Sequence, residues 1–176
     1  MKGTIQLLLG DITAIEADVV VNAANERLVR GGGVCGAIFR GAGRGLDAAC
    51  RKIGHCATGD AVLTPGFHLP AAYIIHTVGP VWQGGEKNEA ALLASCYDNS
   101  LSLAYEHGLR RIAFPSISTG IFGYPTEAAA KIAIDRALCF CKDHAVEVMW
   151  VLFDERTKAA YDAALAEAED EWRQTK

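Results

Sequence analysis

Residues 17–50 read ADVVVNAANERLVRGGGVCGAIFRGAGRGLDAAC, and this stretch contains the unit from which the fold can be built. The apolar, β-branched run at residues 17–22 predicts a buried strand. Three glycines at 31–33 then interrupt the chain. Residues from Val34 to about Cys50 favour a helix, with Gly41 and Gly43 as points where it can break. The stretch predicts a strand, a glycine-rich loop and a helix, in that order.

The same alternation continues along the chain. Further strands are predicted at residues 4–9, 61–64, 73–78, 111–115 and 147–153, and further helices at 88–106, from Pro125 and Thr126 onward, and at 155–171. In the helix at 88–106, Glu89, Asp98 and Asn99 are assigned to the polar side. Strands alternating with helices predict an α/β fold with a mostly parallel sheet covered on both faces. We expect one domain, 1–176, because no linker-like segment divides the chain.

Composition and charge argue against nucleic acid and membranes as partners of this chain. The chain is 51% hydrophobic and 22% charged, and its net charge is −4. This balance is ordinary for a globular protein and unfavourable for a broad nucleic-acid surface. The apolar run at residues 5–9 is too short for a signal peptide or a membrane span, so we expect a cytoplasmic protein. A phosphate would have to be held locally by backbone N–H groups.

The six cysteines are predicted to be free thiols. None forms a CxxC pair, and no export signal directs the chain to an oxidising compartment. Cys50, His55 and Cys56 are not matched by a second pair of ligands at zinc-binding spacing, and Cys139 and Cys141 would face different sides of their helix. The sequence therefore predicts neither a disulfide nor a metal site.

Three loops after predicted strands carry the most informative residues: 10–13, 22–34 and 116–123. Because the carboxyl ends of parallel strands meet at one edge of a sheet, these loops are expected to open on the same edge. Glycines directly before a helix expose N–H groups at its positive end, which suits a phosphate; a purely structural turn is the alternative. The glycine run fits neither P-loop nor dinucleotide-binding spacing.

Five motifs in order along the chain resemble the signature of the macro-domain family. They are GDIT at 10–13, VNAAN at 21–25, GGGVCGA at 31–37, HTVGPVW at 76–82 and PSISTGIFGYP at 115–125. The chain resembles in particular the bacterial branch that hydrolyses O-acetyl-ADP-ribose and mono-ADP-ribose linkages. The resemblance implies a three-layer α/β/α fold around a mixed, mostly parallel sheet, and ADP-ribose-type ligands without a cofactor. A monomer without membrane or nucleic-acid partners is expected.

The resemblance also implies roles for individual residues. Asp11 would accept a hydrogen bond from the adenine amino group, and Phe153 would lie against the adenine. Asn25 would bind the distal ribose, Asn22 would brace the loop, and Phe122 would cover the distal ribose. Structural roles compete with these: a capping carboxylate, asparagines in Asx turns, and phenylalanines in the core. The expected ligand-binding set is Asp11, Ile12, Asn22, Asn25, Gly31, Gly32, Gly33, Val34, Ser118, Thr119, Gly120, Ile121, Phe122 and Phe153.

Cys35 departs from the resembling hydrolases, whose glycine run usually continues GVDGAIH where this chain has GVCGAIF at 33–39. The replaced Asp is thought to orient or activate water, so the general-base role has no carboxylate here, and Phe39 replaces a histidine. Cys35 could act as a nucleophile, but a neighbouring pyrophosphate would oppose a thiolate, which favours a pocket-shaping role. Water oriented by the ligand phosphate remains a mechanism that needs no protein base.

Two functions follow from the resemblance. The first is hydrolysis of O-acetyl-ADP-ribose or of mono-ADP-ribose linked to protein, with Asn25 and Cys35 as the candidate catalytic positions. This chemistry requires neither a metal nor a redox cofactor. The alternative is a non-catalytic ADP-ribose reader, because Cys35 replaces the expected Asp. A third class, RNA binding or scaffolding, is disfavoured by the net acidic charge.

Overall fold

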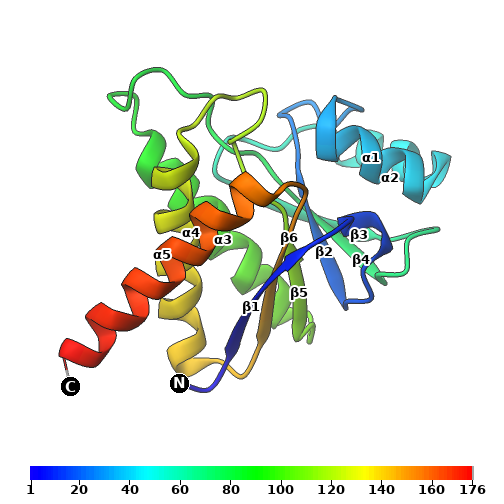
Figure 1. Cartoon of the computed structure of the whole chain (residues 1–176). Helices are drawn as coiled ribbons and strands as arrows, with labels where there is room; N and C mark the ends of the chain where they lie inside the picture. The colour runs from blue at the N-terminus through cyan, green and yellow to red at the C-terminus, as the bar shows by residue number, and fades with distance from the viewer. Residues whose placement is uncertain (176) are drawn as a thin grey trace.

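A six-stranded sheet forms the centre of the computed structural model, which describes residues 1–175 (Figure 1). The strands lie in the order β1-β6-β5-β2-β4-β3. The β3–β4 pair is antiparallel and the other pairs are parallel. Their bounds are β1 Thr4–Leu9, β2 Val19–Ala23, β3 Ala61–Pro65, β4 Tyr73–Thr77, β5 Arg111–Phe114 and β6 Glu147–Leu152. The predicted mixed, mostly parallel sheet is therefore confirmed.

Helices cover both faces of the sheet and give the predicted three layers (Figure 1). On one face lie α1 (Gly33–Ala42) and α2 (Arg44–Ile53), and on the other lie α3 (Glu89–Glu106), α4 (Thr126–Asp143) and α5 (Glu155–Gln174). A short 3-10 helix, η1 (Ile12–Ala14), follows β1. Within residues 1–175, no helix is long and apolar enough to cross a membrane.

Each face of the sheet has its own hydrophobic core. In β2, Val19 and Val21 face the core beneath α3, α4 and α5, whereas Val20 faces the core beneath α1 and α2. This double burial explains why the strand is continuously apolar. The first core contains four fully buried aromatic residues, Tyr97, Phe114, Trp150 and Tyr161. Neighbouring rings in this group pack with centroids 5.1 to 6.0 Å apart, a favourable separation for aromatic pairs.

Gly43 divides the helix that was expected from Val34 to Cys50. Its φ of 88° lies in the left-handed region that glycine adopts without strain. Gly43 ends α1, where its N–H donates to the Phe39 carbonyl, and it also precedes α2. The predicted weak point is thus a true break.

The assignment of Glu89 to the polar side of α3 is wrong, because the residue is buried. It is only 1% exposed, and its carboxylate accepts hydrogen bonds from the backbone N–H groups of Gln83, Gly85 and Lys87. These donors stabilise the buried charge and close the loop before α3 onto the first turn of the helix. The helical pattern could not predict this role, because the partners are backbone groups of a loop.

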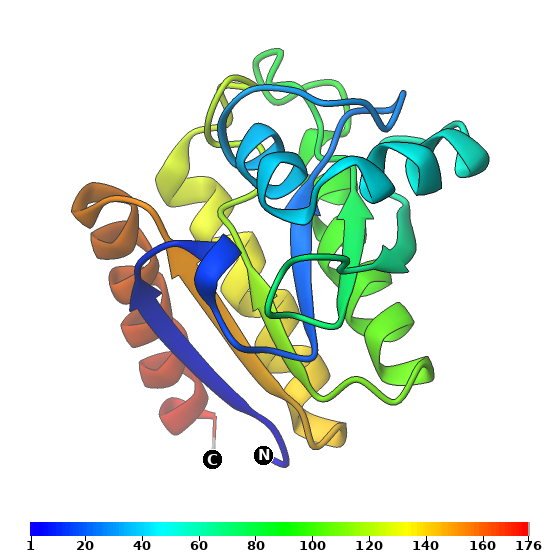
Figure 2. The same ribbon diagram turned by 90° about the vertical axis from the view of Figure 1, so that its right-hand side faces the viewer.

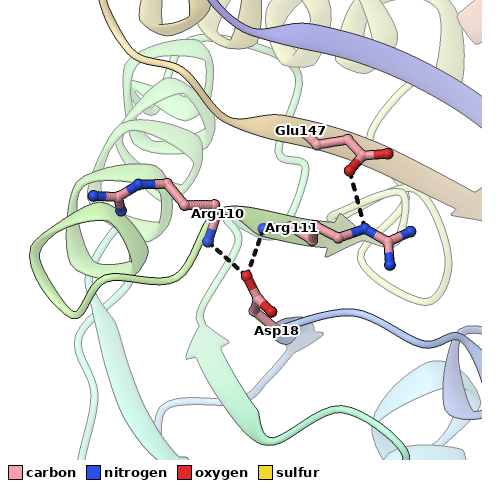
Figure 3. A network of polar contacts seen from close by, with 4 residues as sticks. All are labelled: Asp18, Arg110, Arg111 and Glu147. Carbon is pink, nitrogen blue, oxygen red and sulfur yellow. Dashed lines mark hydrogen bonds and ion pairs between the residues drawn. The ribbon is translucent and has the colours of Figure 1, made fainter.

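Asp18 joins strand ends at the amino edge of the sheet (Figure 3). Its Oδ2 accepts hydrogen bonds from the backbone N–H groups of Arg110 at 2.8 Å and Arg111 at 2.9 Å. The Arg111 side chain donates from Nε to Glu147 Oε2 at 2.9 Å. The beginnings of β2, β5 and β6 are therefore linked at the edge opposite the loops predicted to bind a ligand.

A chain of buried polar side chains crosses β2, β4 and β3. Asn22 Nδ2 lies 3.0 Å from His76 Nδ1, and His76 Nε2 lies 3.0 Å from Thr64 Oγ1. With the Asn22 amide donating to Nδ1, the ring is neutral and Nε2 donates to Thr64. Burial lowers the pKa of His76 to about 4, well below its usual value of 6.5.

This pKa predicts a loss of stability in mild acid. The unfolded chain binds a proton at His76 near pH 6.5, whereas the folded chain binds it near pH 4, so stability falls as the pH drops through this window. The loss should reach about 2 kcal/mol at pH 5, at about 1.4 kcal/mol for each pH unit below 6.5. Urea unfolding at pH 7, 6 and 5 measures it, because most carboxylates titrate below this range. A His76→Gln variant that keeps the same slope would contradict the assignment.

Candidate functional site

Three loops meet at the carboxyl edge of the sheet, as predicted. β1, β6, β5 and β2 are parallel neighbours, so their following loops lie side by side. Figure 2 shows the blue loop after β2 and the yellow-green loop after β5 at the same upper end of the sheet. Residues distant in sequence are therefore brought to one site.

The glycine loop presents the start of α1 without a side-chain cap. Gly32 is the N-cap, and Gly33 has a φ of 56°, which favours glycine. Within residues 1–175, no backbone carbonyl accepts a hydrogen bond from the N–H groups of residues 31–35. Gly36 allows the loop to close over the helix, since a Cβ there would lie 2.6 Å from the Gly31 carbonyl oxygen. The loop thus leaves N–H groups available at the positive end of a helix dipole.

The loop at residues 116–123 offers a second set of donors. None of the N–H groups of residues 116–122 donates to a backbone carbonyl in the described part of the chain. Ser118 is 5% exposed and has a φ of 65°, a conformation uncommon for residues other than glycine. A Cβ at Gly79 would lie 2.1 Å from Ser118 Oγ, so the loop after β4 must carry glycine to pack behind it.

A cavity of about 280 Å³ separates these two loops. The loops approach closely at one point, since a Cβ on Gly32 would lie 3.2 Å from Ile121 Cδ1. The cavity is lined by Ala23, Ala24, Asn25, Gly31, Gly32, Gly33, Val34, Cys35, Ser116, Ser118, Gly120, Ile121 and Phe122. A larger open hollow of about 460 Å³ lies between β3 and α3 and contains none of the predicted site residues.

Cys35 lines the buried wall of this cavity, and Asn22 lies behind it. Cys35 is 6% exposed, and its Sγ lies 3.8 Å from Asn22 Nδ2 and 3.7 Å from the Val29 carbonyl. Burial raises the pKa of the Cys35 thiol, which keeps it protonated at neutral pH. Asn22 has no exposed surface and lies in β2 behind Cys35. Asn22 therefore braces the site from within, and direct contact between its side chain and a ligand is not supported.

Asn25 uses its amide to hold the glycine loop. Its Nδ2 donates to the Val29 carbonyl at 2.8 Å, and its Oδ1 accepts from the Val29 N–H at 3.1 Å. Asn25 therefore has the structural role in the loop that was considered as an alternative to ligand binding. Asn25 also lines the cavity, so bracing and ligand contact are compatible.

Asp11 and Phe153 lie outside the cavity, just beyond the carboxyl ends of β1 and β6. Asp11 Oδ1 accepts from the Thr13 hydroxyl at 2.7 Å and the Thr13 N–H at 2.9 Å, which leaves Oδ2 accessible. The Thr13 hydroxyl and N–H lower the pKa of Asp11. Ile12 is buried in the core, so only its backbone can face a ligand. Phe153 is 88% exposed beyond the end of β6, and the core role considered for it is wrong.

Sequence reasoning missed three lining residues, Ala23, Ala24 and Ser116. Each lies at or just beyond the carboxyl end of β2 or β5. Position after a parallel strand was the available signal, but these small side chains carried no chemistry that marked them. Thr119 was predicted to bind a ligand and is not among the lining residues; its Oγ1 lies 2.6 Å from Ser116 Oγ.

The cysteines are free thiols in the structure, as predicted. Cys139 is exposed and Cys141 is buried, so they do face different sides of α4. Across residues 1–175, the structure brings no three His, Cys, Asp or Glu side chains into a metal-binding group.

Comparisons with known proteins agree with this architecture. Residues 21–133 match the family model described as Macro domain. A macro domain-containing protein of Chlorobaculum tepidum is 54% identical over 164 residues, covering 92% of this chain and 95% of the relative. A Citrobacter koseri protein named O-acetyl-ADP-ribose deacetylase is 49% identical over 177 residues, covering 97% of this chain and all of the relative.

Solved structures show the same fold. The Oceanobacillus iheyensis macrodomain with ADP aligns with a TM-score of 0.93 at 40% identity, covering 97% of this chain and 94% of that chain. The Trypanosoma brucei macrodomain in complex with ADP-ribose aligns with a TM-score of 0.87 at 40% identity, covering 92% and 68%. The family match, the relatives at about half identity and the shared fold show that this chain belongs to the macro domain family.

Proposed function

We propose that this protein binds ADP-ribose across the carboxyl edge of its sheet and hydrolyses O-acetyl-ADP-ribose or mono-ADP-ribose linked to protein. One observation carries the proposal. Two loops with available N–H groups face each other across a cavity that, in the described structure, no lysine or arginine lines. Backbone N–H groups at a helix start are suited to a diphosphate, and they need no basic surface.

The length of the edge also supports an elongated ligand. Asp11 follows β1, Phe153 follows β6, and the cavity lies between the loops after β5 and β2. β1 and β2 are three strand positions apart, about 14 Å at about 4.8 Å per spacing. In our proposal the adenine lies over Asp11 and Phe153, the diphosphate lies between the two N–H-rich loops, and the distal ribose lies toward Asn25 and Phe122.

Hydrolysis is supported by relatives of about 50% identity named O-acetyl-ADP-ribose deacetylase. Cys35 cannot supply a carboxylate base, and its protonated thiol is a poor nucleophile. We therefore propose that water is positioned by the ligand phosphate and the surrounding loops. When an acetyl ester is cleaved, nearby N–H groups would stabilise the developing oxyanion. When a glycosidic bond is cleaved, the same loops would hold the ribose as positive charge develops on it.

A non-catalytic reader is the second candidate, and Cys35 is the observation that favours it. Single-turnover incubation of excess protein with O-acetyl-ADP-ribose or a mono-ADP-ribosylated protein separates the two functions. The proposed hydrolase releases ADP-ribose with first-order kinetics above the uncatalysed rate. A reader protects or merely retains the ligand, so tight binding without release would establish the reader.

Asp11→Ala should weaken ADP-ribose binding by about 1–3 kcal/mol, the scale of a lost charge-assisted hydrogen bond. Calorimetry with ADP-ribose measures this loss. Asp11→Asn is the matched control, because its Oδ1 can still accept from Thr13 while its second oxygen is replaced by an N–H donor. Weak binding by both variants supports the adenine contact. Normal binding by Asp11→Asn would show instead that Asp11 serves only to cap η1.

Asn25→Ala should lower the rate of hydrolysis more than it lowers ADP-ribose affinity, because we expect the amide to orient the reacting ribose. Single-turnover rates and calorimetric affinities test this difference. Asn25→Asp keeps the acceptor for the Val29 N–H but replaces the amide donor with a negative charge, so it tests whether the donor is required. Equal losses of rate and affinity in Asn25→Ala would make the residue a binding group only.

Cys35→Asp should raise hydrolysis by about 10²-fold while leaving ADP-ribose affinity near normal, since a carboxylate there could orient water. Asn22 Nδ2, now 3.8 Å from Cys35 Sγ, could donate to the new carboxylate. Repulsion from the diphosphate allows a modest loss of affinity. Single-turnover rates measure the gain.

Cys35→Ala is the necessary companion variant. A pocket-shaping thiol predicts that most activity is retained, whereas a thiol nucleophile predicts an inactive protein. If Cys35→Ala abolishes turnover and Cys35→Asp does not restore it, the water mechanism is wrong and covalent catalysis takes its place.

A further inference from the structure

Tyr161 connects the carboxyl-terminal helix to the candidate site from behind. It lies in α5, has no exposed surface, and packs against Trp150 with ring centroids 5.7 Å apart. Its hydroxyl donates to Ser116 Oγ at 3.0 Å, across 45 positions of sequence. Ser116 lines the cavity, so a single side chain separates the Tyr161 hydroxyl from the proposed ligand.

The hydrogen-bonded chain continues from Ser116 into the loop. Ser116 Oγ lies 2.6 Å from Thr119 Oγ1, a short separation between two hydroxyl groups. A serine hydroxyl has one proton and two acceptor positions, so Ser116 can accept from Tyr161 while it bonds to Thr119. The chain Tyr161–Ser116–Thr119 therefore spans the first turn of the loop.

Few backbone hydrogen bonds restrain this turn, although Ile117 and Ser118 within it are buried. Within residues 1–175, the N–H groups of residues 116–122 donate to no backbone carbonyl. The later part of the loop is held by Tyr124 N–H donating to the Ser118 carbonyl and by Trp82 N–H donating to the Phe122 carbonyl. Besides the Tyr124 bond to the Ser118 carbonyl, the hydroxyl groups of Tyr161, Ser116 and Thr119 provide the hydrogen bonds that restrain the segment from Ser116 to Thr119.

We propose that Tyr161 is a positioning residue that sets the direction of the N–H donors at residues 119–122 through Ser116 and Thr119. The inference rests on the proposed function, because those donors matter only if they hold a phosphate. It assigns α5 a part in ligand affinity, although α5 itself contributes no residue to the cavity lining. A residue that only fills the core would stabilise the fold without affecting the loop.

Tyr161→Phe tests the inference with minimal disturbance, because it keeps the ring in the core and removes only the hydroxyl. Tyr105→Phe is the control: Tyr105 lies near the end of α3, away from the cavity lining, and its ring packs against Phe140 and His144. Calorimetry with ADP-ribose, thermal unfolding and amide hydrogen exchange of the peptide covering residues 116–123 are measured for each variant.

Tyr161→Phe should weaken ADP-ribose binding about three- to tenfold, the range expected for one lost hydrogen bond, and should speed exchange in residues 116–123. Tyr105→Phe should stay within about twofold of the unsubstituted protein in affinity. In a double-mutant cycle, Tyr161→Phe should cause no further loss in a Ser116→Ala background, because both act through one chain.

Three results would overturn the inference: unchanged affinity and exchange in Tyr161→Phe, equal losses in Tyr105→Phe, or additive losses in the cycle. A lower melting temperature with unchanged affinity would assign Tyr161 to the core alone. Failure of the proposed function looks different, because the unsubstituted protein itself would then not bind ADP-ribose. In that case Tyr161 has no role in ADP-ribose affinity. Hydrogen exchange still decides whether Tyr161 restrains residues 116–123.

Discussion

The parallel alignment of β1, β6, β5 and β2 is the constraint on which the site depends. Four neighbouring strands that run in one direction place four consecutive carboxyl ends along one edge. Loops that are far apart along the chain then become neighbours in space. Their separation follows from the spacing between strands, which gives the edge the dimensions of an extended ligand.

Backbone geometry, rather than side-chain charge, determines the character of this edge. Among residues 1–175, two loops leave N–H groups without backbone partners, and glycines allow the close approaches that shape them. A chain with a net charge of −4 can bind an anion by this means, since the donors are local and oriented. Cys35 lies among them as a buried, protonated thiol, so the wall of the cavity is neutral.

The site is supported from several directions. Asn22 and His76 lie behind Cys35 in the sheet, and Tyr161 reaches Ser116 from α5. Glu89 closes the loop that carries Trp82, whose N–H donates to the Phe122 carbonyl. Oriented donors need such support, because a loop that moves freely loses the benefit of its geometry. The core and the site are therefore connected through hydrogen bonds as well as through packing.

The sequence by itself determined the α/β class, the order of most elements and the common edge of the three loops, because apolar runs, glycines and strand–helix alternation are local signals. It also singled out Cys35, where the chain departs from the hydrolases that it resembles. Only the tertiary structure showed that Glu89 is buried, that Phe153 is exposed, and that Tyr161 bonds to Ser116. Periodicity reports the burial expected of a position, whereas a hydrogen-bond partner depends on which distant groups the fold brings together.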